Sequence, residues 1–233
     1  PQKELEKQVR NKLHQIWGAF SSGKVQYKKI LSRFQSEIEQ GRKLKDSLKK
    51  VLEFHSSTRE RLPILTEFYK KIFEVTGKPS TILDIACGFN PLTLPWMGLD
   101  SSAKYEAFDI NKEEIDFLNE IIRTMHLKNY TNIYFSNVFD INYKKNYDVV
   151  FLFKALPVLE QQEKGISKKI LNNLKFNYAV VTFPVKSING QEKGMKRYYE
   201  KSFLDLIKDK FSIITEIHYT NELVFIIKKL LHA

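Results

Sequence analysis

Short β-rich runs alternate with helical stretches through the last two thirds of the chain. The helical stretches are expected at 111–126, 158–174 and 198–210, and the β-rich runs are TILDIA (81–86), YEAFDI (105–110), NIYFSNV (132–138), YDVVFLF (147–153) and YAVVTFP (178–184). Such alternation predicts right-handed β-α-β units, which build a mostly parallel sheet with helices on both faces.

The last two β-rich runs follow a different rule. FSIITEIHY (211–219) and ELVFIIKKL (222–230) are separated by only Thr220 and Asn221, too few residues for a parallel crossover. They are expected to form an antiparallel hairpin. The sequence therefore predicts a seven-stranded, mostly parallel sheet with an antiparallel C-terminal hairpin.

The N-terminal third has a helical pattern instead. Its apolar residues recur at steps of three and four, first at Leu5, Val9, Leu13, Ile16, Trp17 and Phe20, then at Tyr27, Ile30, Leu31, Phe34 and Ile38, and after Gly41 at Leu44, Leu48, Val51 and Leu52. This spacing predicts helices whose apolar faces form a core. The change in pattern at 76–80 divides the chain into a helical domain, 1–78, and an α/β domain, 79–233.

Positive charge is concentrated in the helical domain. Residues 1–78 contain 18 Lys and Arg against 9 Asp and Glu, whereas residues 79–233 contain 20 against 18. An excess confined to one end favours a polyanionic partner, nucleic acid above all, with a solvated helical surface and a membrane surface as alternatives. Basic membrane helices usually have a broad apolar face, which is absent here. The candidates for RNA contact are Lys24, Lys28, Lys29 and Arg33.

Several other classes are disfavoured. No apolar run approaches the roughly 20 residues that span a bilayer, and the start of the chain lacks the apolar core of a signal peptide. Cys87 is the only cysteine and the five histidines show no metal-binding spacing, so no disulfide and no metal are expected. We expect a cytoplasmic protein, whose native N-terminus is missing or processed because residue 1 is proline.

The loop DIACGFNPLTLPWMGLD, from Asp84 to Asp100, is the main candidate site. A strand that ends in Asp84 and turns at Gly88 places backbone N–H groups at the carboxyl edge of the sheet, where open α/β folds bind ligands. Asp109 ends the next strand, where a carboxylate can accept hydrogen bonds from both ribose hydroxyls. The phosphate-binding pattern G-x-G-x-x-G is absent, because Asn90 and Pro91 occupy its end, and this disfavours a dinucleotide.

S-adenosylmethionine suits this loop better, because it has no phosphates and carries a cationic sulfonium. Strand order then assigns each candidate to a part of the cofactor. The methionine moiety is expected near Asp84, Ala86 and Gly88, the ribose at Asp109 beside Ile110, the adenine at Asn137 and Val138, and the methyl group at Phe153 and Lys154.

Four stretches carry a more specific resemblance. HSSTRERLP (55–63), DIACGFNPLTLPWMGL (84–99), FKALPVLEQQEKG (153–165) and FPVKSINGQEKGM (183–195) resemble the aminoglycoside-resistance 16S ribosomal RNA methyltransferases that methylate N7 of guanine 1405. The resemblance runs from about His55 to the C-terminus, whereas residues 1–54 match only in being helical and basic.

This resemblance implies a Rossmann-like class I S-adenosylmethionine methyltransferase whose product is S-adenosylhomocysteine. It implies that Arg59 grips the methionine carboxylate and that Ser57 and Gln161 contact the cofactor. Ser57 and Glu60 also have capping-box spacing, so the motif is alternatively a helix start. Pro63 should kink or restart that helix, and Arg61 could face RNA.

Guanine N7 carries an exposed lone pair, so its methylation needs alignment and electrostatics rather than a general base. Lys154 and Lys186 are the expected catalytic residues. We expect phosphate contacts from Lys193, Lys196 and Arg197, and stacking on the base by Phe89, Tyr198 or Tyr199. The expected partner is 16S rRNA in the small (30S) ribosomal subunit, and the expected state is a monomer. The alternatives are another ribosomal base such as adenine N1, a noncatalytic ribosome-binding factor, and a small-molecule methyltransferase.

Overall fold

The computed structural model describes residues 25–127, 130–140, 144–185 and 194–230. The chain divides into two compact units between Pro63 and Ile64. The predicted boundary after Lys78 lies beyond helix α5 (Leu65–Thr76), whose aromatic rings pack on the sheet of the second unit. Among the described residues no helix is both long enough and apolar enough to span a bilayer.

The first unit contains α2 (Tyr27–Glu39), α3 (Leu44–Leu52) and α4 (Ser56–Arg61). Five of the predicted apolar positions are buried in its core: Ile30, Phe34, Leu48, Val51 and Leu52. The other four in the described residues are only partly buried: Tyr27, Leu31, Ile38 and Leu44. After α4 the chain passes through a short 3-10 helix, η1 (Leu62–Ile64), as expected from Pro63. The apolar stripe predicted over residues 5–20 lies outside the described residues.

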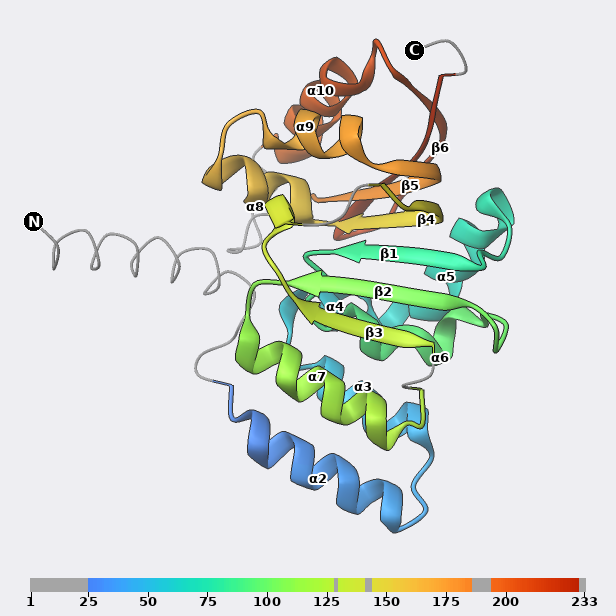
Figure 1. The fold of residues 1–233 in the computed structure, drawn as a ribbon, viewed down its shortest axis with the longest axis vertical. Helices are drawn as coiled ribbons and strands as arrows, with labels where there is room; N and C mark the ends of the chain where they lie inside the picture. The colour runs from blue at the N-terminus through green and yellow to red at the C-terminus, as the bar shows by residue number, and fades with distance from the viewer. Residues whose placement is uncertain (1–24, 128–129, 141–143, 186–193, 231–233) are drawn as a thin grey trace, which may run out of the picture. The chain divides into compact units, whose positions relative to one another are not determined.

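The second unit is built on a seven-stranded sheet of order β3-β2-β1-β4-β5-β7-β6 (Figure 1). The strands are β1 (Thr81–Ile85), β2 (Lys104–Asp109), β3 (Thr131–Phe135), β4 (Asn146–Phe153), β5 (Lys175–Pro184), β6 (Phe211–His218) and β7 (Glu222–Lys229). The first five strands pair in parallel, whereas β7 is antiparallel to both β5 and β6. The predicted sheet and terminal hairpin are confirmed.

Helices cover both faces of the sheet. On one face α8 (Ala155–Gln162), α9 (Ile166–Asn173) and α10 (Met195–Ile207) share an apolar core with side chains of β1, β4, β5 and β7. On the other face the α5 rings of Phe68 and Tyr69 pack on Phe153 and Phe151 of β4. The single helix predicted over 158–174 is two helices, because Gly165 adopts a left-handed φ of 85° between them.

Two further helices follow β1 and β2. The chain leaves β1 through the 3-10 helix η2 (Asn90–Thr93) and the short α6 (Leu94–Met97), and it leaves β2 through α7 (Lys112–Thr124). The 3-10 helix η3 (Val138–Asp140) follows β3. Since β1 pairs with both β2 and β4, the strand order reverses at β1, and the arrowheads of β1 to β4 point to the same edge in Figure 1. Open α/β sheets bind ligands at that edge.

Candidate functional site

The loop after β1 is fastened to the end of β2. Ala86 and Gly88 both have left-handed backbone, with φ of 55° and 45°. That conformation costs a residue with a Cβ roughly 1–2 kcal/mol. The N–H of Cys87 donates to the Phe108 carbonyl over 3.1 Å, and the N–H of Gly88 donates to the Asp109 carboxylate over 3.0 Å. The loop therefore turns sharply and leaves Ala86 exposed at the carboxyl edge.

A buried polar network supports this loop from below. The Asp84 carboxylate accepts hydrogen bonds from the Tyr105 hydroxyl and from the Asn90 side-chain amide, the latter over 2.8 Å. The Tyr69 hydroxyl donates to Asn90 Oδ1 over 2.8 Å and lies 2.6 Å from Thr93 Oγ1. Burial and the nearby Asp84 charge raise the pKa of Tyr105 well above its usual value, so its hydroxyl keeps its proton. Asp84 thus holds the loop in place, and its contact with the methionine moiety stays a prediction.

Asp109 forms the acidic end of β2. Its Oδ2 accepts from Gly88, and its Oδ1 accepts from the N–H groups of Ile110 and Asn111 over 2.7 and 3.3 Å. Burial raises the pKa of Asp109, and these backbone donors oppose that rise. The carboxylate is therefore fixed in direction at the edge where a ribose is predicted. Ile110 contributes through its backbone N–H.

The residues predicted at the adenine follow β3. Ser136 donates its N–H to the Asp109 carbonyl over 3.0 Å, which joins the end of β3 to the end of β2. Asn137 is exposed and Val138 is buried. The structure thus brings both positions to the same edge as Asp109.

The end of β4 carries a second strained residue. Lys154 has a φ of 55°, and its N–H donates to the Thr182 carbonyl and hydroxyl of β5 over 3.1 and 3.0 Å. Its side chain is largely buried, as is that of Phe153. Gln161 lies exposed near the end of α8. Left-handed residues therefore follow both β1 and β4, the adjacent strands at the point where the strand order reverses: Ala86 after β1 and Lys154 after β4.

Helix α4 carries the STRER motif. The helix begins at Ser56 and its N-cap residue is His55, which makes no side-chain cap hydrogen bond. The alternative that this motif marks a helix start is confirmed, because α4 begins at Ser56, but Ser57 lies inside the helix and is not its N-cap. Arg59 is exposed and donates to the Glu53 carbonyl over 3.5 Å. Its contact with a methionine carboxylate stays a prediction, as does cofactor contact by Ser57.

Arg61 is buried, contrary to the prediction. Its side chain is 1% exposed, so the guanidinium is not presented to solvent. A residue that contacts RNA phosphates needs an accessible charged group. The suggested RNA contact for Arg61 is therefore wrong.

The other cations predicted at RNA differ in their surroundings. Lys28 and Lys29 lie on the first turn of α2, and Arg33 follows one turn later with an ion pair to Glu37. Lys196 and Arg197 are at the start of α10, where Lys196 pairs with Glu200 over 3.6 Å. Three further candidates lie outside the described residues: Lys24, Lys186 and Lys193.

The aromatic candidates separate clearly by burial. Phe89 is 1% exposed and packs against Phe117 of α7, so its predicted stacking on a base is wrong. Tyr199 stacks on Phe183 and is half-buried. Tyr198 is 67% exposed and keeps its place as a stacking candidate.

The residues that support the loop carry no local signal in the sequence. Tyr69, Tyr105 and Thr182 are buried members of apolar stretches, and nothing in those stretches shows where their hydroxyls point. Asn90 does stand out as a residue where glycine is usual. Its function as a bridge between Asp84 and α5 becomes visible only in three dimensions.

Two features lie away from this edge. The ligand atoms of Glu200, Glu216 and His218 lie within 4.8 Å of one another, and His218 Nε2 is 2.7 Å from Glu216. Because Glu200 already pairs with Lys196, and Glu216 already has His218 as a neighbour, we assign no ion to this group. A hollow of about 380 Å³ on α7 contains none of the predicted cofactor residues; it is lined by Asp116, Asn119, Glu120, Ile122 and Arg123.

Comparisons with known proteins agree with this geometry. The family model described as "Ribosomal RNA methyltransferase (FmrO)" matches residues 1–226. A 16S rRNA (guanine(1405)-N(7))-methyltransferase of Micromonospora echinospora is 34% identical over 96% of this chain and 82% of the relative. One of the same name from Proteus mirabilis is 32% identical over 99% and 86%.

Solved structures show the same likeness. The 16S rRNA methyltransferase RmtF, solved in complex with S-adenosyl-L-homocysteine, superposes with a TM-score of 0.84 at 30% identity, covering 98% of this chain and 84% of that one. The 16S rRNA methylase ArmA gives a TM-score of 0.69 at 37% identity, with coverage of 86% and 98%. The strand order is accordingly that of a Rossmann-like class I methyltransferase. With the match extending through both compact units, the chain belongs to the FmrO family of ribosomal RNA methyltransferases.

Proposed function

We propose that this chain transfers the methyl group of S-adenosylmethionine to N7 of guanine 1405 in 16S rRNA and thereby confers aminoglycoside resistance. The observation that carries the proposal is the family match over residues 1–226, which spans the helical unit and the sheet alike. The substrate is the RNA within the small ribosomal subunit. The enzyme acts in the cytoplasm as a monomer and without a metal ion.

The described residues fit S-adenosylmethionine. The Asp109 carboxylate is held by three backbone donors, so it is oriented before a ribose arrives. Ala86 is exposed on a left-handed turn, where its single methyl group lets a ligand approach the backbone. Neighbouring Asn137 and Val138 supply a polar and an apolar contact for a purine. The loop does not have the glycines of a pyrophosphate cradle, and this cofactor needs none.

The chemistry requires alignment rather than proton transfer. When bound, S-adenosylmethionine supplies a methyl carbon that guanine N7 attacks as the carbon–sulfur bond breaks, and the positive charge passes from sulfur to the base. N7 has no proton to lose, so no general base is needed. The protein's contribution is to hold the two reactants in line and to exclude water.

Each predicted residue has a part in that alignment. Asp109 fixes the ribose, and Arg59 pairs with the methionine carboxylate. Lys154, after β4, lies at the reacting edge, where its backbone is clamped by Thr182. Lys186 and Lys193 are proposed to hold phosphates around the flipped base together with Arg197.

The product explains the resistance. Methylation of N7 removes a hydrogen-bond acceptor and adds a positive charge in the groove where polycationic drugs bind. Both changes weaken binding of an aminoglycoside, because they replace an attractive contact by electrostatic repulsion.

Cleavage at 7-methylguanosine tests the proposal. Small subunits are incubated with the protein and cofactor, and their RNA is then treated with borohydride and aniline. A new cleavage at guanine 1405 is expected, and it should be lost with Asp109→Ala. Methyl incorporation without cleavage in the decoding region would move the target to another base such as adenine N1. Absence of incorporation alongside stable subunit binding would indicate a noncatalytic factor.

A further inference from the structure

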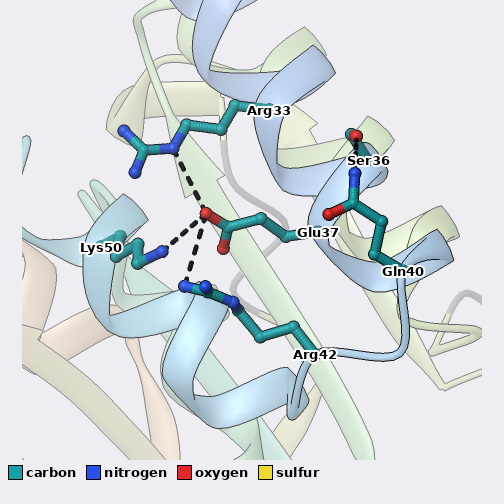
Figure 2. Close-up of polar contacts among 6 residues, drawn as sticks. All are labelled: Arg33, Ser36, Glu37, Gln40, Arg42 and Lys50. Carbon is teal, nitrogen blue, oxygen red and sulfur yellow. Dashed lines mark hydrogen bonds and ion pairs between the residues drawn. The ribbon is translucent and has the colours of Figure 1, made fainter.

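Three cations of the first unit converge on one carboxylate. Glu37 Oε1 lies 2.6 Å from Lys50 Nζ, 3.3 Å from Arg33 Nε and 3.7 Å from Arg42 Nη1 (Figure 2). Arg33 belongs to α2, Arg42 to the turn after it and Lys50 to α3. One acidic residue therefore joins basic residues from three successive segments.

The backbone of the turn brings Arg42 back to Glu37. Gly41 is left-handed with a φ of 77°, its N–H donates to the Ile38 carbonyl over 2.9 Å, and the N–H of Arg42 donates to the Glu37 carbonyl over 3.0 Å. These two bonds form a Schellman motif, which ends α2 in a defined geometry. Arg42 is thus held by Glu37 through both the main chain and the carboxylate.

The charged side chains of this cluster differ in their exposure to solvent. The Glu37 side chain is 14% exposed, whereas those of Arg33 and Arg42 are 67% and 47% exposed. Arg33 uses Nε toward Glu37, and its two terminal nitrogens lie on the far side of the guanidinium in Figure 2. The Glu37 carboxylate therefore lies beneath the more exposed arginines. Together with Lys50, these four residues have a net charge of +2. The terminal N–H groups of an arginine fork match the geometry of a phosphate.

Glu37 remains ionised over the whole physiological pH range. The Lys50 hydrogen bond is the main reason that the pKa of Glu37 is lowered from 4.5 to about 2. Without this carboxylate the three cations would repel one another and spread over many rotamers. Ordering them again on RNA would then cost side-chain entropy.

We propose that Glu37 is a positioning residue that holds Arg33, Arg42 and Lys50 as a preformed site for the phosphate backbone of ribosomal RNA. The inference rests on the proposed function for its partner. The ordering gained from Glu37 outweighs the repulsion between its negative charge and the RNA.

A charge-matched pair of variants tests this inference. Glu39 is exposed on the same helix and takes part in none of these three ion pairs, so Glu39→Gln removes the same charge without disturbing the cluster. If net charge alone decided affinity, Glu37→Gln and Glu39→Gln would both tighten binding. We instead expect Glu37→Gln to weaken it about threefold to tenfold, and to lower the salt slope by about 1 for each phosphate that the cluster no longer neutralises. Equilibrium binding to 30S subunits without cofactor is the measurement.

Double variants keep the test independent of stability. Lys50→Gln should weaken binding in the wild-type background and have a smaller effect beside Glu37→Gln, since the cluster is already disordered there. Binding is measured well below the thermal midpoint of each variant. If Glu37→Gln binds as tightly as Glu39→Gln, the positioning role is overturned.

The same measurements separate this inference from the proposed function. If the wild-type chain does not bind subunits, the proposed function itself fails. If it binds and methylates while Glu37→Gln is indistinguishable from Glu39→Gln, only the positioning role fails. Equal affinity for vesicles containing phosphatidylserine would overturn RNA as the occupant.

Discussion

Asn90 Nδ2 donates to Asp84 Oδ2 over 2.8 Å and so joins the candidate cofactor loop to the strand from which it leaves. The opposite end of the same amide accepts from Tyr69 of α5. A helix, a strand and a loop therefore depend on one side chain.

Asn90→Ala should destabilise the second unit by about 1–3 kcal/mol, because it leaves buried polar partners on Asp84 and Tyr69 without their hydrogen bonds. Cofactor affinity should fall with it, since the loop loses its support. Urea unfolding and calorimetric titration with S-adenosylmethionine provide the two readouts. Asn177→Ala, which removes an exposed hydrogen bond to Asp148, is the control and should change stability little. Equal effects of the two variants would contradict the supporting role of Asn90.

Asp109→Asn should weaken binding of S-adenosylmethionine about tenfold or more, because charge-assisted hydrogen bonds to the ribose are lost. Burial raises the pKa of Asp109, so the carboxylate takes up its proton at a higher pH than an exposed aspartate. Affinity should therefore fall on acidification in the wild type and stay flat over that window in the variant. Asp116→Asn on the exposed side of α7 should behave as wild type in calorimetry at each pH. A wild-type affinity that is independent of pH down to the ordinary aspartate pKa would refute this role.

Lys154 can be tested for its backbone and its amine separately. Lys154→Gly and Lys154→Ala both remove the amine, but only alanine keeps the Cβ that the left-handed conformation disfavours. Lys154→Gly should therefore be the more stable variant by about 1 kcal/mol. If the amine takes part in methyl transfer, both variants lose the same large fraction of kcat on 30S subunits. Retained activity in Lys154→Gly alone would assign the role to the backbone turn.

Glu37 should make the full chain sensitive to acid. Its pKa is lowered from 4.5 to about 2 in the folded chain, so its contribution to stability is complete above pH 4.5 and is lost as the pH falls to 2. The thermal midpoint of the helical unit, followed by far-UV circular dichroism, should fall further over this window in wild type than in Glu37→Gln. Glu39→Gln should follow the wild-type curve. Parallel curves for wild type and Glu37→Gln would show that the carboxylate is not linked to folding.

Regular elements are predictable from this sequence because their apolar spacing is local. The strand that contains Asp84 and the helix that begins at Tyr27 both follow from such spacing. Helix α5 has the same spacing, at Leu65, Phe68, Tyr69, Ile72 and Phe73, so it is predictable in the same way. The break at Gly165 is hidden because one glycine inside an apolar pattern does not by itself end a helix. The burial of Arg61 and the bridge made by Asn90 depend on residues distant in sequence, so no local pattern contains them.

The insertion of β7 between β5 and β6 affects how the protein is made. Its residues from Leu223 to Ile227 are fully buried, yet β7 is synthesised after the six strands that it completes. Until β7 has emerged from the ribosome, the edge of β5 with which it pairs stays open to other strands. Assembly of the sheet must therefore wait until β7 has been synthesised, and a premature stop before Glu222 would release an aggregation-prone fragment.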